Sequence, residues 1–389
     1  MIKLILLSDF TESFAYKILK GVLEYSRRHE AWVVSRMPPS YRERNGVAGV
    51  LEWAKFWEAD AILGRFENEE EALAYRNAGM VVFAQDYKER FSRVPSLSSD
   101  YIATGRMAAQ FFVQKGYTSF AFVGYRDAFW SKERCMGFQH FLEEAGYGNN
   151  LSIYEGQSID DVWFYEMPNL VAFLKNLPHG TAVFACDDNQ GSRLTEICKV
   201  NDIKIPIQLA ILGVDNDETV CSLSDPPLSS ILLDVEQTAH DVAMQIAELL
   251  NGTLTDATDV VGKPIKVVER ISTDIITTDD PHVRVALKYI HEHATTEISV
   301  EDVLKQVPLC RRQFEKRFRE ATHLSVYKYI LELRIARFAQ ALLLSEGNVK
   351  DIATDLGFLN YKSLSRQFKL ITGLSPLRYR EQNRNVLNE

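Results

Sequence analysis

Residues 368–379, "FKLITGLSPLRY", repeat a passage that stands 50 residues earlier, "FREATHLSVYKY" at 318–329. Phe, Thr, Leu, Ser and the final Tyr occupy the same offsets in both passages. The spacing of apolar residues around each passage predicts a short helix, a turn and a second helix. The predicted helices span 301–306 and 311–320 in the first copy, and 350–356 and 361–370 in the second. The last part of the chain therefore holds one helical unit twice, joined by a helix near 326–344.

The second helix of each copy has an apolar face and a mainly basic face. Phe314 and Phe318 form the apolar face in the first copy, and Leu364 and Phe368 form it in the second. A helix anchored in this way, with Arg, Lys and Ser near its N-terminus, suits the DNA major groove. Two joined units would read two groove segments about 34 Å apart. The residues predicted to bind DNA are Arg311, Arg312, Glu315, Lys316, Tyr361, Lys362, Ser363, Arg366 and Lys369, with Arg312 and Arg366 as the best candidates for base contacts.

The charge distribution also indicates that this region binds nucleic acid. The chain has a net charge of −9, yet residues 281–389 hold 18 Lys and Arg against 12 Asp and Glu. The remaining residues hold 26 basic and 41 acidic side chains. A basic tail on an acidic body indicates that any contact with DNA belongs to the tail. A plain bundle with solvated basic residues is the alternative, and the matching placement of charge in both copies disfavours it.

Upstream of residue 235, short β-rich runs alternate with amphipathic helical stretches. The alternation predicts right-handed βαβ units and two doubly wound sheets, separated near residue 100. The predicted strands span 3–9, 32–37, 61–66, 80–85, 119–125, 151–156, 181–188 and 209–215.

Ligands of doubly wound sheets bind beyond the carboxyl ends of the strands. The residues there mix carboxylates, arginines and aromatic rings, which are the groups that recognise a polyol. A purine stacked between Phe129 and Trp130 is an alternative ligand, and each aspartate taken alone could simply cap the next helix. The residues that follow the predicted strands are Ser8, Asp9, Phe10, Arg65, Phe66, Gln85, Asp86, the segment 126–134, Asp187, Asp188, Asp215, Asn216 and Asp217.

The composition indicates a reduced, cytoplasmic protein, associated with the nucleoid when it is bound to DNA. The start, "MIKLILLSD", lacks the basic lead and cleavage site of a secretion signal, and no apolar stretch approaches the ~18 residues of a membrane span. The five cysteines are scattered without a CxxC pair, so we expect no disulfide, structural zinc or other cofactor. His291 and His293 stand two apart on a predicted helix, which disfavours a metal pair.

Residues 96–275 closely resemble the ligand-binding domain of LacI-family repressors, and residues 1–95 resemble it loosely, through the order of their strands. The resemblance is carried by "SLSSDYIATGRMAAQFFVQKGYTSFAFVGY" from 96, "ERCMGFQHFLEEAGY" from 133 and "TAVFACDDNQGSRLTEICKVNDIKIPIQLAILGVDND" from 181. It implies a two-lobed periplasmic-binding-protein-like fold that closes on a small effector. It further implies that Arg134 grips the effector, Asp215 accepts from its hydroxyls and Asp187 faces the pocket. Two features depart from that family: Asn216 replaces a usual second acid, and the chain begins at its first strand where the family has a helix-turn-helix.

The second helical copy resembles the DNA-binding domain of the AraC family. "DIATDLGF" at 351–358 and "SRQFKLITGLSPLRYR" at 365–380 carry this resemblance, which covers roughly 284–382. The first copy is looser, with His323 at the place of a usual Gly and Val326 at that of a usual Pro. The resemblance implies an all-α domain with two helix-turn-helix units.

We therefore predict an α/β two-lobed, LacI-like effector-binding domain over 1–274, with chain crossings near 100, 232 and 262–272. A linker over 275–282 and an all-α DNA-binding domain over 283–389 would follow. Replacement of Arg134 or Asp215 by Ala is expected to abolish effector binding and to leave the fold intact. The residues predicted to bind the effector are Asp9, Phe10, Phe129, Trp130, Arg134, Asp187 and Asp215.

This order of domains resembles that of the xylose operon activators. The resemblance implies a sugar-responsive activator of transcription, a homodimer that works with RNA polymerase, and a pentose effector such as D-xylose. An enzyme acting on a sugar or nucleotide in the cleft is the main alternative. It is disfavoured because the sequence has no Walker loop, GxSxG, HExxH or GxGxxG after a strand. A binding module without DNA activity is a third alternative.

Overall fold

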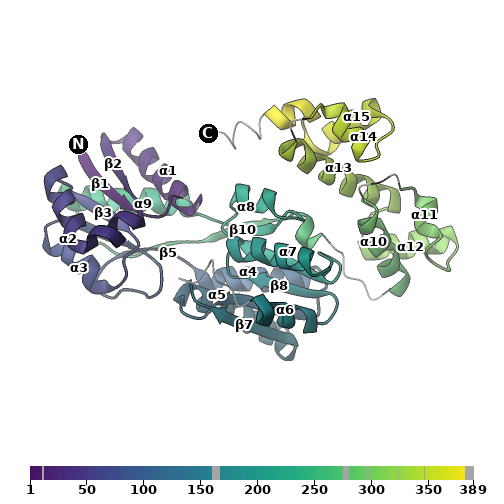
Figure 1. The fold of residues 1–389 in the computed structure, drawn as a ribbon, viewed down its shortest axis with the longest axis horizontal. Helices are drawn as coiled ribbons and strands as arrows, with labels where there is room; N and C mark the ends of the chain where they lie inside the picture. The colour runs from purple at the N-terminus through teal and green to yellow at the C-terminus, as the bar shows by residue number, and fades with distance from the viewer. Residues whose placement is uncertain are drawn as a thin grey trace.

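The computed structural model describes residues 1–10, 13–159, 167–274, 280–294, 296, 298–322, 324–345 and 347–381. Two α/β lobes are followed by a helical domain, which we call the reader, and the reader lies beyond the second lobe (Figure 1). In the described part of the chain, no helix combines the length and apolar character that crossing a bilayer demands.

The first lobe is built on a parallel sheet in the order β11-β5-β4-β3-β1-β2. The strand β1, which lies between β3 and β2, is buried on both faces: Leu4 and Leu6 pack toward α1 and α9, whereas Ile5 and Leu7 pack toward α2 and α3. This explains why the strand is a continuous apolar run. The elements are β1 Ile2–Leu7, α1 Ser13–Arg28, β2 Trp32–Met37, α2 Pro39–Trp57, β3 Ala61–Gly64, α3 Glu69–Asn77, β4 Val81–Gln85, β5 Ser96–Ser99, α9 Val235–Leu250 and β11 Val260–Gly262.

The second lobe has a sheet in the order β12-β10-β9-β8-β6-β7, in which only β12 runs antiparallel to its neighbour. The chain passes between the lobes after β5, after β10 and between β11 and β12 (Figure 1). The elements are α4 Tyr101–Gln114, β6 Ser119–Tyr125, α5 Phe129–Glu144, β7 Leu151–Gln157, α6 Met167–Asn176, β8 Thr181–Ala185, α7 Asp188–Val200, β9 Leu209–Val214, α8 Glu218–Leu223, β10 Ser229–Leu233, β12 Pro264–Val268 and the 3-10 turns η1 Gly148–Asn150 and η3 Ile271–Thr273.

The expected two-lobed α/β class is confirmed, but the expected number of strands was wrong. Each sheet has six strands and not four, because β5, β10, β11 and β12 were missed. β11 has three residues and β5 is mostly serine, so neither shows the apolar run or alternation that predicts a strand.

The reader contains two helical units that share one long helix. The first unit packs Val303, Phe314 and Phe318 against the N-terminal half of α13, and the second packs Leu364 and Phe368 against its C-terminal half. The predicted linker residues 275–279 lie outside the described residues, and the helical region begins at Pro281. The helices are α10 Pro281–Glu292, α11 Val300–Leu304, α12 Arg311–Thr322, α13 Val326–Leu344, α14 Val349–Asp355 and α15 Tyr361–Thr372.

Candidate effector site and DNA-binding helices

Arg134, on the second turn of α5, is the centre of the candidate effector site. Its side chain is buried, with 3% exposure, and Nη1 donates to the carbonyl oxygen of Cys186. Nη2 lies 3.5 Å from Asp215 Oδ1, and the guanidinium lies 5.0 Å and 5.3 Å from the ring centres of Trp130 and Tyr101. Nε is buried and has no acceptor among the described residues, so Arg134 retains a donor for a further group.

Phe129 joins this group through Tyr101, whose ring meets it edge-on at 5.8 Å. The guanidinium of Arg90 lies 5.1 Å from the centre of the Phe129 ring. The backbone N–H of Phe129 donates to the carbonyl of Lys88 at 3.2 Å, which ties the start of α5 to the segment that follows β4 in the first lobe. The aromatic rings predicted to cover a ligand therefore already carry arginine cations, which are strong donors to hydroxyl or carboxylate oxygen.

The loop after β9 carries Asp215 in an unusual backbone conformation. Asp215 has φ 102° and Asn216 has φ 46°, a region that side chains other than glycine rarely adopt. Lys17 of α1, in the other lobe, donates from Nζ to the carbonyl oxygens of both residues, at 3.3 Å for Asn216. This contact between the lobes holds the loop that presents the Asp215 carboxylate to Arg134.

Asp187 and Asp188 have different roles at the start of α7. Asp187 caps the helix, because its Oδ1 accepts from the N–H of Gln190 at 2.7 Å, as the capping alternative predicts. Asp188 is buried and supports the loop after β9: it accepts from Ser230 Oγ at 2.5 Å and from the N–H of Asp217 at 2.7 Å. Burial, followed by the charge of Asp215, raises the pKa of Asp188. The sequence shows Asp188 only as a residue that follows a predicted strand, and it does not reveal its contacts with the loop after β9.

Asp9 and Phe10 follow β1 in the first lobe, and Phe10 belongs to a different group of side chains. Its ring meets Tyr16 edge-on at 5.6 Å, and the guanidinium of Arg36 lies 5.7 Å from its centre. Of the seven predicted effector residues, Trp130, Arg134 and Asp215 are brought together directly. Phe129 joins them through Tyr101, and Asp187 adjoins them through its chain neighbour Cys186.

Asp86, at the end of β4, was not among the predicted effector residues. Ser98 Oγ and Tyr101 Oη both donate to its Oδ2, at 2.5 Å and 2.9 Å. Burial raises the pKa of Asp86 to about 6, although these hydrogen bonds oppose the rise. Because Tyr101 also touches Arg134 and Phe129, Asp86 anchors the first-lobe side of the candidate site.

The Asp86→Asn variant should be more stable than the wild type near pH 7.5. The folded pKa lies above that of an unfolded aspartate, so the native state retains this proton between about pH 4 and 6 and loses stability as pH rises through that range. Asparagine keeps an acceptor without ionising. We expect its free energy of unfolding to be higher by roughly 1–3 kcal/mol at pH 7.5 and unchanged near pH 4. Denaturation at both pH values, with Asp241→Asn as a control, checks this; a less stable variant at pH 7.5 would contradict it.

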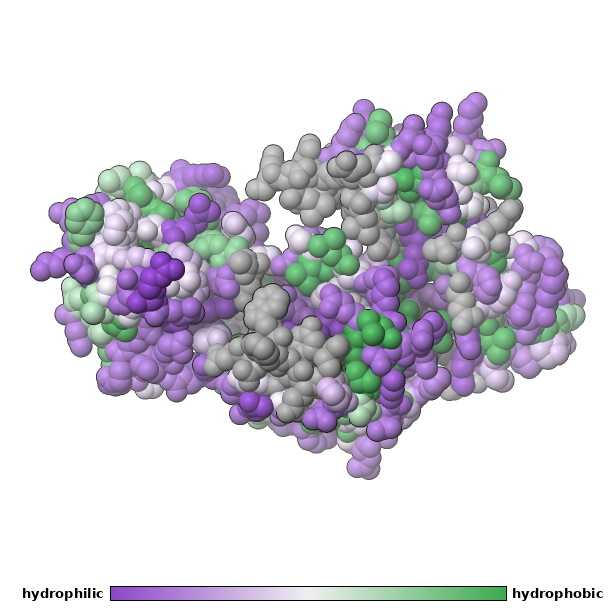
Figure 2. Space-filling view, in the orientation of Figure 1, coloured by the Kyte–Doolittle hydropathy of each residue, from purple (hydrophilic) through white to green (hydrophobic). Residues whose placement is uncertain are grey.

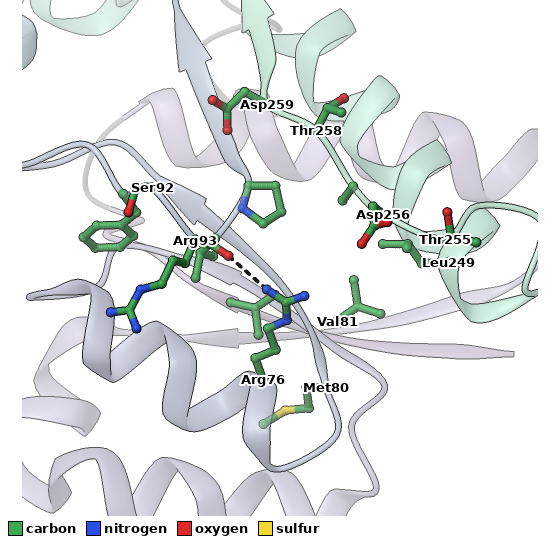
Figure 3. Close-up of a pocket in the computed structure, with 15 residues that line it drawn as sticks. Arg76, Met80, Val81, Ser92, Arg93, Leu249, Thr255, Asp256, Thr258 and Asp259 are labelled. Atoms are coloured by element: carbon green, nitrogen blue, oxygen red, sulfur yellow. Dashed lines mark hydrogen bonds between the residues drawn. The ribbon is translucent and has the colours of Figure 1, made fainter.

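A hollow of about 510 Å³ on the first lobe lies elsewhere and contains none of the seven predicted residues. Figure 3 shows it between β4, the segment 91–95 and the residues after α9. Its polar groups are used internally: Arg76 donates to the carbonyl of Arg93 at 2.9 Å, and Arg93 pairs with Glu69 and Glu70. We do not assign the effector to it.

The second helices of the two reader units point their basic residues outward. In α12, Arg311, Arg312 and Lys316 are exposed while Phe314 and Phe318 are buried. In α15, Lys362, Ser363, Arg366 and Lys369 are exposed, and Tyr361 packs partly against the core of its unit. The visible face of the reader is mostly hydrophilic with small hydrophobic patches (Figure 2). The helix start at Tyr361 follows from Asn360, which accepts from the N–H of Ser363 at 3.0 Å.

The helices α12 and α15 differ in whether their basic side chains form ion pairs within the protein. In α12, Arg311 pairs with Glu301 at 2.8 Å and Glu315 at 2.9 Å, and Lys316 lies 3.8 Å from Glu320. Across the described residues, the basic side chains of α15 and Arg312 form no ion pair. Since DNA phosphates need not displace an internal partner there, α15 and Arg312 are better placed for DNA contact.

Replacement of Arg366 or Arg312 by Ala should relax sequence preference at one base pair each. A base contact of this kind contributes about 1–3 kcal/mol of discrimination. Competition binding with single-base operator variants measures this change. Arg317→Ala is the matched control, because Arg317 lies on α12, pairs with Asp280 and is not among the predicted DNA-binding residues. Equal weakening on every sequence would mean that the residue contacts phosphate.

Comparison with known proteins identifies both parts of the chain. Residues 109–273 match the family model of a periplasmic binding protein-like domain, and residues 304–382 match that of a helix-turn-helix domain. The xylose operon regulatory protein of Escherichia coli K12 is 25% identical over 99% of this chain and 98% of its own length. That of Haemophilus influenzae is 28% identical over 82% of this chain and 84% of its own length.

Solved structures show the same fold. The xylose-binding transcription activator XylR superposes with a TM-score of 0.74 at 23% identity, covering 97% of both chains. A LacI regulator from Alkaliphilus metalliredigens, complexed with D-xylulofuranose, superposes with a TM-score of 0.56 at 19% identity, over 70% of this chain and 99% of its own. The homologues are regulators and not enzymes. The chain thus joins a periplasmic-binding-protein-like sensor to an AraC-type helix-turn-helix domain and is a DNA-binding transcription regulator homologous to the xylose operon regulators.

Proposed function

We propose that this regulator is an activator that responds to a pentose, with D-xylose as the first candidate. The observation that carries the proposal is the group around Arg134: a buried guanidinium with a spare donor, a carboxylate at Asp215 and the rings of Trp130 and Tyr101. A sugar hydroxyl can donate to Asp215 and accept from Arg134, while a ring covers its C–H face. The names of the full-length relatives add support for xylose.

A stacked purine is less well supported. Arginine guanidinium groups lie 5.1 Å from the Phe129 ring centre and 5.0 Å from that of Trp130. A base stacked on either ring would compete with the cation that already lies against that ring.

The proposed mechanism couples lobe closure to the pairing of two copies. A bound sugar would favour the closed arrangement of the lobes in proportion to its differential affinity for that state. Closure would change how the sensors of a homodimer meet, and it would bring the two readers into register on their DNA sites. RNA polymerase is the proposed downstream partner, and the cytoplasm is the proposed compartment.

The experiment is thermal denaturation of the full chain with D-xylose, L-arabinose, D-ribose, D-glucose and adenosine. We expect D-xylose, or another pentose, to raise the transition temperature of the wild type. Asp215→Asn should lose this response, and Asp241→Asn, on the outer helix α9, should keep it. Stabilisation by adenosine alone, or by no sugar, would overturn the proposal.

A further inference from the structure

Hydrogen bonds from several elements fix the loop after β9, and one of the residues that form them, Arg270, adjoins the segment that contacts the reader. Its N–H groups are all used: Asp215 donates to the Ile231 carbonyl at 2.9 Å, Asn216 to Ser230 Oγ at 3.0 Å and Asp217 to Asp188 at 2.7 Å. A backbone in the left-handed region persists only where its surroundings fix it. An effector that binds Asp215 and displaces it must therefore also displace the residues that accept these hydrogen bonds.

Arg270 is the support on the outer side of this loop. Its Nη2 donates to Asn216 Oδ1 at 2.9 Å and to Glu218 Oε2 at 3.1 Å, and its Nη1 donates to the Leu228 carbonyl at 3.0 Å. The side chain is only 14% exposed. Three acceptors arranged around one planar guanidinium fix its position closely, which a lysine could not reproduce.

The backbone of Arg270 continues into the end of the sensor that touches the reader. The 3-10 turn η3 is fully buried, and Ser272 Oγ donates to the Ile211 carbonyl at 2.6 Å. Asp274 follows at once, and its carbonyl accepts from Tyr329 Oη of α13 at 3.5 Å. Tyr329 Oη is also 2.8 Å from His291 Nε2 of α10, so this contact is part of the first reader unit.

In the same region, charged side chains of the sensor influence the pKa of groups in the reader. Burial lowers the pKa of Arg337 on α13, and the carboxylates of Asp225 and Asp274 oppose this change. Burial raises the pKa of Tyr379 in the second unit; Glu218 adds to the rise and Arg270 reduces it. Arg270 and its partner Glu218 therefore lie within electrostatic reach of the second unit, while η3 leads to the first.

We propose that Arg270 is a positioning residue that transmits the state of the effector loop to the reader, through Asn216 on one side and η3 with Asp274 on the other. It binds neither effector nor DNA itself. This inference deepens the proposed function, because it assigns the route by which effector occupancy would alter DNA binding. Such a route needs a structural element whose conformation is affected both by the effector site and by the reader. The loop after β9, together with Arg270, is that element.

The first test needs no effector. Hydrogen exchange is compared between the wild type, Arg270→Gln and Arg106→Gln as full chains. Arg106 is the matched control, because it forms an ion pair with Glu144 on the same lobe and makes no contact with the loop or η3 among the described residues. We expect Arg270→Gln to speed exchange both at 217–220 and at 329–337, and Arg106→Gln to change neither. Faster exchange at 217–220 alone would overturn the proposal.

The second test uses D-xylose as the probe. The ratio of operator affinities with and without D-xylose should fall in Arg270→Gln from the 5- to 150-fold typical of allosteric proteins to nearly 1. Its D-xylose affinity should stay within about threefold of the wild type, a change of less than 1 kcal/mol. An unchanged ratio would overturn the proposed route. If D-xylose does not change the operator affinity of the wild type, D-xylose is not the effector. The hydrogen-exchange comparison, which needs no effector, would then still test the role of Arg270.

Discussion

The Arg134→Ala variant is expected to lose its thermal response to D-xylose and to unfold more easily than the wild type by about 3–5 kcal/mol. Removal of this buried side chain would leave the Asp215 carboxylate without its cation and the Cys186 carbonyl without its donor. It would also remove the cation that lies against the rings of Trp130 and Tyr101. Calorimetry with and without D-xylose measures both effects.

A second substitution separates binding from folding. Arg134→Lys keeps the charge and most of the stem but loses the planar fork, so it should fold and still respond weakly to the sugar. Lys132→Ala, an exposed residue on the same helix, is the control and should behave as the wild type. If Arg134→Lys kept the full response to every sugar that stabilises the wild type, Arg134 would have only a structural role.

Phe368→Ala should unfold the second reader unit and leave the sensor intact. Phe368 has no exposed surface, and its ring meets Phe338 edge-on at 5.5 Å and Tyr379 at 5.3 Å. Truncation of a buried Phe costs about 3–5 kcal/mol, which is comparable with the whole stability of so small a unit. Operator affinity should fall to the level that the first unit alone supports, while the thermal transition of the sensor and its response to D-xylose persist.

Leu370→Ala is the matched control for this experiment. Leu370 lies two residues further along α15 but is 80% exposed, so its truncation should cost little stability. DNA footprints would distinguish the outcomes: Phe368→Ala should lose protection over one of two groove segments. A complete footprint would contradict the assignment of α15 as a DNA-reading helix.

The features that the sequence predicts well depend on local pattern. Several of the predicted strands are apolar runs, as at Thr181–Ala185, where every residue is buried. The helix predicted at 361–370 is α15, which begins beside the capping side chain of Asn360, and the helix predicted near 326–344 is α13. In each case the signal lies within a few residues of the feature.

The features that the sequence does not predict depend on distant partners. The serine-rich strand β5 is stabilised by Asp259, which accepts from the N–H of Ser96 at 2.8 Å across 163 positions of sequence. Lys17 and Arg270 reach the effector loop from elements far from it in the chain. The expectation that Arg134→Ala would spare the fold neglected the burial of Arg134, which becomes evident only when α5, β8 and β9 are assembled.

The helix α13 is part of two hydrophobic cores, and this limits the promoters that the protein can use. Its first half is fixed by Val326, Ile330 and Leu333, and its second half by Ile335 and Phe338. Because α12 and α15 both pack on α13, their relative position is fixed. One base pair inserted between the two DNA segments that they contact would rotate one segment by about 34° about the duplex axis. Natural promoters should therefore vary freely in sequence at that central stretch while preserving its length.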